Sequence, residues 1–296
     1  MLSHRPLVAA TLVLFSALAA GAPPAAPESL TADQSAEIAR AALAPLDPSV
    51  LELSTAMLGQ IDIPPRHPWL ARILSPIAHA RPFHHDCPRG GSVKGKLADR
   101  DRSEDLSERD RFVTTFSDCR FDAGDPVSGR SECVVREHRL DGSLDVTLLA
   151  CQFQALGTPA LRWTGPVEVL VQTDLRSGAE HRVTTFRDLA VQRDGAPTYR
   201  WTLVVDMQYS PLGDHTGTIN GTLAAPGLGP LALAQETPFV VDKDGSARSG
   251  RLLVTSPRGS RIRVEVMGAS QTISYFGKDN PGDVPDAESV REIQAR

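Results

Sequence analysis

The chain is poor in lysine, in aromatic residues and in long apolar runs. Lysine occurs only at Lys94, Lys96, Lys243 and Lys278, aromatic residues make up 5% of the 296 residues, and the formal net charge is −5. Nucleic-acid-binding proteins carry a basic surface that neutralises phosphate, so no nucleic-acid partner is expected. Beyond residue 20 there is no run of about 20 apolar residues, the length that crosses a bilayer. The mature chain is therefore expected to have no transmembrane segment.

The longest apolar run lies at the amino terminus. Arg5 precedes an apolar stretch from Leu7 to Ala20, and small residues continue to Ala22. A basic start, a short apolar stretch and small residues are typical of a secretory signal peptide. We therefore expect residues 1–22 to be a signal peptide and the protein to be exported, either periplasmic or secreted. Scarce lysine beside abundant Arg, Ala, Pro and Gly suggests a GC-rich bacterial genome.

The few cysteines, Cys87, Cys119, Cys133 and Cys151, all follow the predicted signal peptide. An even number of cysteines in an oxidising compartment favours two disulfides, for which three pairings are possible. We favour the sequential pairing, because neighbouring strands of a meander bring together residues that are close in sequence. A zinc site is the alternative, but it lacks the usual pair of cysteines two to four residues apart.

Residues 23–86 are expected to form a helical segment and a Pro/His-rich connector. Thr31 with a glutamine three residues later has the pattern of a capping box, and apolar residues then recur at helical spacing until Pro45. Further helix starts are indicated at Asp47 and at Pro68.

Residues 87–276 have a period of two, which is typical of strands with one buried face. Residues 201–209 show it most clearly, and residues 261–266 and 167–171 follow the same pattern. The other candidate strands are 111–116, 133–140, 144–154, 181–191, 215–224, 237–242, 250–255 and 271–276. Asp141-Gly142, Asp194-Gly195 and Asp244-Gly245 are hairpin signals between such runs.

The predicted fold class is mainly β. Without helices between the strands, an antiparallel meander is expected. About ten to twelve strands are too many for a flat open sheet, so the meander is expected to form a curled sheet, a barrel or a sandwich, preceded by the short helical segment. Residues 277–296 are expected to be a polar tail with a weak helix from Asp286.

Three stretches approach binding motifs without completing them. The segment 90–97 nearly spells a phosphate-binding loop, but no Ser or Thr follows Lys96. The acidic segment 99–110 alternates oxygen-bearing side chains as calcium loops do, but Glu104 stands where the sharp turn needs glycine. His84 and His85 are adjacent and so point in different directions. No cofactor and no metal are therefore expected.

No G-x-S-x-G nucleophile motif occurs in the chain. His138, His181 and His215 lie on predicted strands or turns with Asp and Ser nearby in sequence. Because a catalytic triad assembles in space, these histidines are the candidates for a hydrolytic site.

Cys87-Pro-Arg-Gly90-Gly91, then strand-forming residues, Phe116-Ser-Asp-Cys119 and a later Gly129 form a C-x-x-G-G … F-x-x-C layout over residues 87–130. This layout resembles that of uncharacterised exported bacterial β-rich proteins. The charged stretch 99–111 departs from it, because small polar residues are usual there. The resemblance implies a Cys87–Cys119 pairing and implies no activity.

The leading hypothesis for function is a non-enzymatic binding or scaffold protein of the bacterial periplasm or envelope. Its partner would be an envelope protein or an apolar small ligand. Two alternatives stay open: an envelope hydrolase with a spatially assembled site, and a carrier of an apolar ligand in a β cavity. Fold alone does not choose between them.

Overall fold

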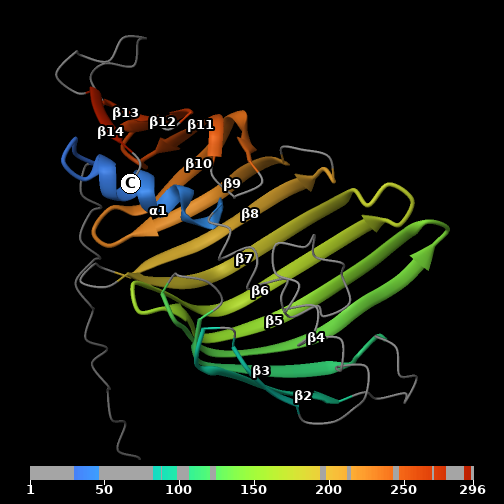
Figure 1. The fold of residues 1–296 in the computed structure, drawn as a ribbon. Coiled ribbons are helices and arrows are strands. Elements are labelled where there is room, and N and C mark those ends of the chain that lie inside the picture. The colour runs from blue at the N-terminus through green and yellow to red at the C-terminus, as the bar shows by residue number, and fades with distance from the viewer. Residues whose placement is uncertain are drawn as a thin grey trace, which may run out of the picture.

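A computed structural model describes residues 30–46, 83–87, 89–98, 107–120, 125–193, 198–211, 215–242, 247–268, 270–277 and 290–294. These residues form one antiparallel sheet of 14 strands, in which each strand pairs with the next one along the chain (Figure 1). The sheet is curled (Figure 1). It is also open, because among the described residues β1 pairs only with β2 and β14 only with β13.

The sheet is preceded by one short helix, α1 (Ser35–Leu43), and a 3-10 turn, η1 (Ala44–Leu46). The strands are β1 (Phe83–Asp86), β2 (Ser92–Ala98), β3 (Arg111–Cys119), β4 (Val127–Asp141), β5 (Leu144–Thr158), β6 (Leu161–Asp174), β7 (Glu180–Arg193), β8 (Tyr199–Tyr209), β9 (His215–Ala225), β10 (Gly229–Val241), β11 (Ala247–Thr255), β12 (Arg261–Met267), β13 (Ser270–Phe276) and β14 (Val290–Gln294).

The mainly β meander predicted from the sequence is confirmed, and its curled, open form replaces the barrel and the sandwich. Two strands fall where none was expected. β1 lies in the predicted connector, and β14 lies in the predicted polar tail. The predicted signal peptide at residues 1–22 and the predicted helices after Asp47 and Pro68 lie outside the described residues.

The helix α1 lies across the concave side of the sheet (Figure 1) and contacts β12 and β13. It begins one turn later than the sequence predicts, at Ser35, although half of the capping box is present: the Thr31 backbone N–H donates to Gln34 Oε1 at 3.0 Å. Ile38, Ala39 and Ala42 are buried. Among the described residues, the chain contains no helix with the length and apolar character that a bilayer crossing requires.

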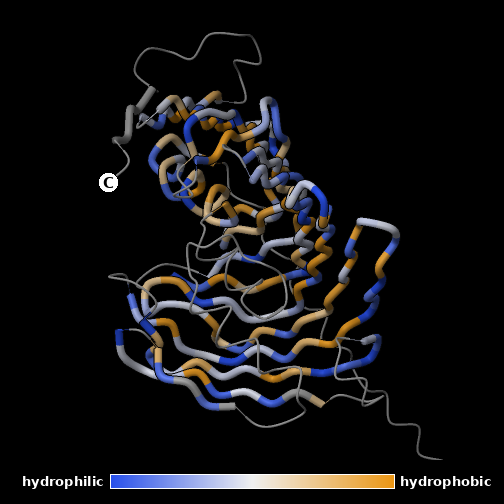
Figure 2. Tube along the Cα trace, turned by 45° about the vertical axis from the view of Figure 1, so that its right-hand side comes forward, coloured by the Kyte–Doolittle hydropathy of each residue, from blue (hydrophilic) through white to orange (hydrophobic). Residues whose placement is uncertain are grey.

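The two faces of the sheet differ in chemistry, because apolar and polar residues alternate along each strand (Figure 2). We call the buried face the inner face; on β8 it carries Trp201, Leu203, Val205 and Met207, as the sequence predicts. The outer face is polar and carries cross-strand ion pairs, including Arg111–Glu132, Arg187–Glu168, Arg200–Asp188, Arg251–Glu265 and Arg263–Glu236.

A line of β-bulges crosses the middle of the sheet and accounts for its curl. The register shifts between Phe116 and Cys119 in β3, between Phe153 and Leu156 in β5, and between Phe186 and Leu189 in β7. Glycines with positive φ lie between them on β4 and β6, at Gly129 and Gly165. A bulge bends its strand and increases the local twist, so aligned bulges turn the whole sheet inward.

Two disulfides fasten the first half of the sheet. Cys87 bonds Cys119, and Cys133 bonds Cys151, its direct partner in the β4–β5 register. This is the sequential pairing favoured from the order of the strands. Both bonds are buried beside the hydrophobic core.

Candidate functional site

Cross-strand register places a row of polar residues on the inner face, near one end of strands β4 to β9. Asp145 on β5 lies opposite Thr173 on β6, Thr173 opposite Glu180 on β7, and Glu180 opposite Tyr209 on β8. The next inner-face row contains His138, Thr147 and Arg182. We call this set the polar strip; its members are His138, Asp145, Thr147, Thr173, Glu180, Arg182, Tyr209 and His215.

The centre of the polar strip is a buried ion pair. The Arg182 guanidinium donates a hydrogen bond to the Glu180 carboxylate, and both side chains are only 8% exposed. The guanidinium also lies 4.7 Å from the centroid of the Tyr209 ring, which gives a cation–π contact. A buried pair of this kind is retained only where both charges are well partnered.

His215 continues the polar strip on β9. Its ring lies 4.9 Å from the Tyr209 ring between centroids. The backbone N–H of Ser210 donates to His215 Nδ1 at 3.3 Å, so a neutral imidazole there carries its proton on Nε2. Thus Glu180, Arg182, Tyr209 and His215 contact one another in sequence across three strands.

His138 and Asp145 form the other end of the polar strip. His138 Nε2 lies 3.4 Å from Asp145 Oδ1, an atom that is fully buried. Along the sheet His138 and His215 are separated by five strand spacings, roughly 24 Å at about 4.8 Å each.

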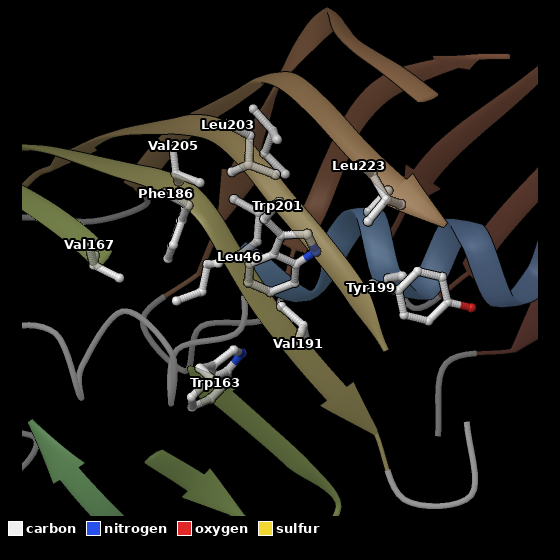
Figure 3. Packing of buried hydrophobic residues seen from close by; sticks show 14 of the residues in the cluster. Leu46, Trp163, Val167, Phe186, Val191, Tyr199, Trp201, Leu203, Val205 and Leu223 are labelled. Carbon is white, nitrogen blue, oxygen red and sulfur yellow. The ribbon is translucent and has the colours of Figure 1, made fainter. Parts of the chain in front are cut away.

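Beyond the polar strip the inner face is apolar. The third row runs from β5 to β9 and contains Leu149, Val169, Thr184, Val205 and Ile219. All five are almost fully buried, and Thr184 is the polar one. Further along the strands lie the rings of Trp163, Phe186 and Trp201, which we call the aromatic cluster. Leu46 of η1 lies beside the ring of Trp201 (Figure 3). The inner face therefore changes from charged to apolar along the direction of its strands.

Three buried hydrogen-bonding groups on this apolar part lack a partner within the described residues. They are the indole N–H groups of Trp163 and Trp201 and the hydroxyl of Thr184. The Trp163 and Trp201 side chains are 2% and 0% exposed, so water does not reach these donors. A buried polar group without a hydrogen bond costs about 1–3 kcal/mol, and each such group in a native structure needs a physical explanation.

The three candidate histidines do not assemble into one site. His138 and His215 lie at opposite ends of the polar strip, and His181 lies on the outer face. There His181 Nδ1 contacts Gln172 Oε1 at 3.1 Å, and Nε2 contacts Asp206 Oδ1 at 2.9 Å. Neither His138 nor His181 contacts a hydroxyl or thiol among the described residues.

The other motifs of the sequence do not form sites in the described parts of the chain. Lys94 and Lys96 lie in the extended strand β2, not in a loop that could cradle phosphate. Residues 99–106 of the acidic segment lie outside the described residues, and residues 107–110 form a turn in which Asp110 accepts hydrogen bonds from Ser107. No group of three or more potential metal ligands occurs among the described residues.

No protein-family model, curated protein or solved structure was found to match this chain significantly. The arrangement itself offers binding chemistry: a charged, titratable strip beside an apolar surface with unpaired hydrogen-bond donors. Glu180, Arg182 and Tyr209 were not singled out from the sequence as site residues. Alternation along β7 predicts that Glu180 and Arg182 share a face with Thr184 and Phe186, but only the register brings Tyr209 beside them.

Proposed function

We propose that this protein is an exported binding protein of the bacterial envelope whose inner face holds an amphipathic ligand with an acyl chain. The acyl chain of the ligand packs on the apolar rows of β6–β9, and its carbonyl or carboxylate oxygens accept hydrogen bonds from the unpaired donors of these rows. This proposal joins two of the expectations from sequence, a binding protein and a carrier of an apolar ligand.

The observation that carries the proposal is the set of unpaired donors on the apolar inner face. Trp163, Trp201 and Thr184 each offer a buried donor, and an apolar chain alone would leave all three unpaired. A fatty acid or an acyl ester presents carbonyl or carboxylate oxygens that accept such hydrogen bonds, together with a chain that favours apolar surface by about 0.8 kcal/mol per buried methylene. The ligand class is therefore apolar with hydrogen-bond acceptors.

Export to the periplasm or beyond is part of the proposal. It is supported by the signal-peptide pattern of residues 1–22 and by the two disulfides, which persist in oxidising compartments. A site for hydrolysis has less support, because the structure separates the candidate histidines and leaves His138 and His181 without a nucleophile partner in the described residues.

Thr184→Val tests the proposal, because it removes one unpaired hydroxyl and keeps the shape of the side chain. The free protein should gain about 1 kcal/mol of unfolding free energy, measured by urea denaturation of delipidated protein. Affinity for a long-chain fatty acid should fall about fivefold to tenfold, measured by calorimetric titration. Thr185→Val, at the neighbouring outer-face position of β7, is the matched control and should leave the affinity unchanged.

Native mass spectrometry of the protein purified from a bacterial periplasm gives the direct readout. The native spectrum should contain extra mass in the range of acyl lipids, and solvent extraction should release it. A Thr184→Val variant that loses stability without losing affinity would contradict the role given to the hydroxyl. A wild-type protein that takes up no acyl ligand at all would contradict the proposed function.

A further inference from the structure

Three of the four large exposed apolar side chains of the described residues lie at one end of the sheet. The four are Leu140 (66% exposed), Met267 (60%), Leu175 (57%) and Val204 (38%). Leu140, Leu175 and Met267 lie where β4, β6 and β12 end, while Val204 lies mid-strand on β8. Because the strands are antiparallel, all even-numbered strands end on the same side. We call this side of the sheet, with its turns, the rim.

The turns that carry Leu140 and Leu175 are neighbours at the rim. They close the β4–β5 and β6–β7 hairpins (Figure 1), and the backbone N–H of Leu175 donates to the carbonyl of Ser143 at 2.8 Å. Asp174 fixes the second turn, since its carboxylate accepts hydrogen bonds from the Arg176 backbone at 2.9 Å and from the Ser177 hydroxyl at 2.8 Å. Both leucines thus stand on defined hairpin ends.

The rim is also the end of the sheet at which the polar strip lies. Leu140 is opposite Asp145 in the β4–β5 register, and so it belongs to the same cross-strand row as Thr173 and Glu180. Any molecule that enters the inner face from this end of the strands passes the two leucines first.

We propose that the rim docks on the surface of a lipid bilayer, with Leu140 and Leu175 inserted at the boundary between headgroups and acyl chains. This inference rests on the proposed function and names the source of the ligand: an acyl lipid passes between the bilayer and the inner face over the polar strip. A stable protein partner is the less suitable occupant, because it needs roughly 800 Å² on each side, whereas the two hairpin ends offer a pair of protruding side chains.

Charges of both signs flank the two leucines at the rim: Asp141 follows Leu140 and is exposed, and Asp174 precedes Leu175. Arg176 is exposed directly beside Leu175, and Arg139, 59% exposed, precedes Leu140 and contacts Glu137 at 2.8 Å. These groups give no excess of basic charge, so apolar insertion provides the attraction to the bilayer. Neutral vesicles should therefore bind the protein at least as tightly as anionic vesicles.

Vesicle flotation of the mature, disulfide-bonded protein tests the inference. The wild type should float with vesicles of phosphatidylcholine, whether or not they contain phosphatidylglycerol. The double variant Leu140→Asp/Leu175→Asp should lower the partition coefficient at least about tenfold, because two apolar contacts are lost and two charges must be desolvated. Val204→Asp, an exposed apolar residue away from the rim, is the matched control and should float like the wild type.

Other outcomes separate this inference from the proposed function. Flotation of the double variant equal to that of the wild type, or no flotation of the wild type with either vesicle, would overturn the inference. Both variants should keep their circular dichroism spectra and the wild-type affinity for a soluble fatty acid in the absence of vesicles. If the wild type floats but binds no fatty acid, the proposed function fails while rim docking stands. Leu140→Ser/Leu175→Ser repeats the test without added charge.

Discussion

Two tyrosine hydroxyl groups hold the amino-terminal segment against the sheet. Tyr199 on β8 donates a hydrogen bond to the carboxylate of Glu37 in α1, and Tyr275 on β13 donates to the backbone carbonyl of Leu30 at 2.8 Å. Burial, and then the hydrogen bond and charge of Glu37, raise the pKa of Tyr199 above its ordinary value. These contacts position η1, and with it Leu46, over the aromatic cluster of the inner face.

At the residue scale, Tyr199→Phe should lower the unfolding free energy at pH 7 by about 2 kcal/mol, because it removes a hydrogen bond to a charged group. A raised folded-state pKa stabilises the fold below the ordinary tyrosine pKa of about 10, and this contribution is lost as pH rises above it. The difference in unfolding free energy between the wild type and Tyr199→Phe should therefore become smaller above pH 10. Urea denaturation at pH 7 and at pH 10.5 measures it. Tyr275→Phe, which loses a bond to a neutral carbonyl, should cost about 1 kcal/mol at pH 7. If wild type and Tyr199→Phe differed in unfolding free energy by the same amount at pH 7 and at pH 10.5, the proposed role of the Tyr199 hydroxyl would be wrong.

At the scale of elements, the curl depends on close approaches of neighbouring strands. Gly221 on β9 has a φ of +138°, and a Cβ atom there would lie 2.5 Å from the Leu203 Cα atom on β8. Backbone of this kind is accessible to glycine and strained for other residues. Strands β8 and β9 can approach each other this closely because position 221 has no side chain.

Gly221→Ala should therefore destabilise the protein by about 3 kcal/mol or prevent folding, since it combines backbone strain with a steric clash. Gly142→Ala in the β4–β5 turn is the matched control. Gly142 also has a positive φ, +63°, but no atom lies within 4 Å of its added Cβ, and we expect a cost of about 1 kcal/mol. Thermal unfolding followed by circular dichroism measures both; equal losses would show that the close approach to β8 is unimportant.

Local patterns explain why the strands were predictable and the site was not. Alternation in residues 201–209 identified β8 and its buried side, and Asp141-Gly142 identified the β4–β5 turn. β1 and β14 lie at the edges of the sheet, and neither was predicted from the sequence. The polar strip depends on the register of the strands. The register shift between Val135 and Glu137 decides which face His138 occupies, and no local sequence pattern predicts this shift.

At the scale of the whole molecule, one curled sheet separates two chemical environments. The outer face carries charges in exposed cross-strand pairs, which contribute little to stability. The inner face is covered: its apolar rows are almost fully buried, and among the described residues α1 and η1 belong to the layer on that side. We expect an acyl chain to share this face with the protein's own side chains.

Tryptophan quenching by a brominated fatty acid tests whether an acyl chain occupies the inner face. In a Trp69→Phe background the remaining tryptophans are Trp163 and Trp201, both buried on the inner face. A fatty acid brominated in mid-chain should quench their emission saturably, and the same acid without bromine should not. Unchanged emission at every concentration of the brominated acid, with the fold intact, would contradict an acyl-binding inner face.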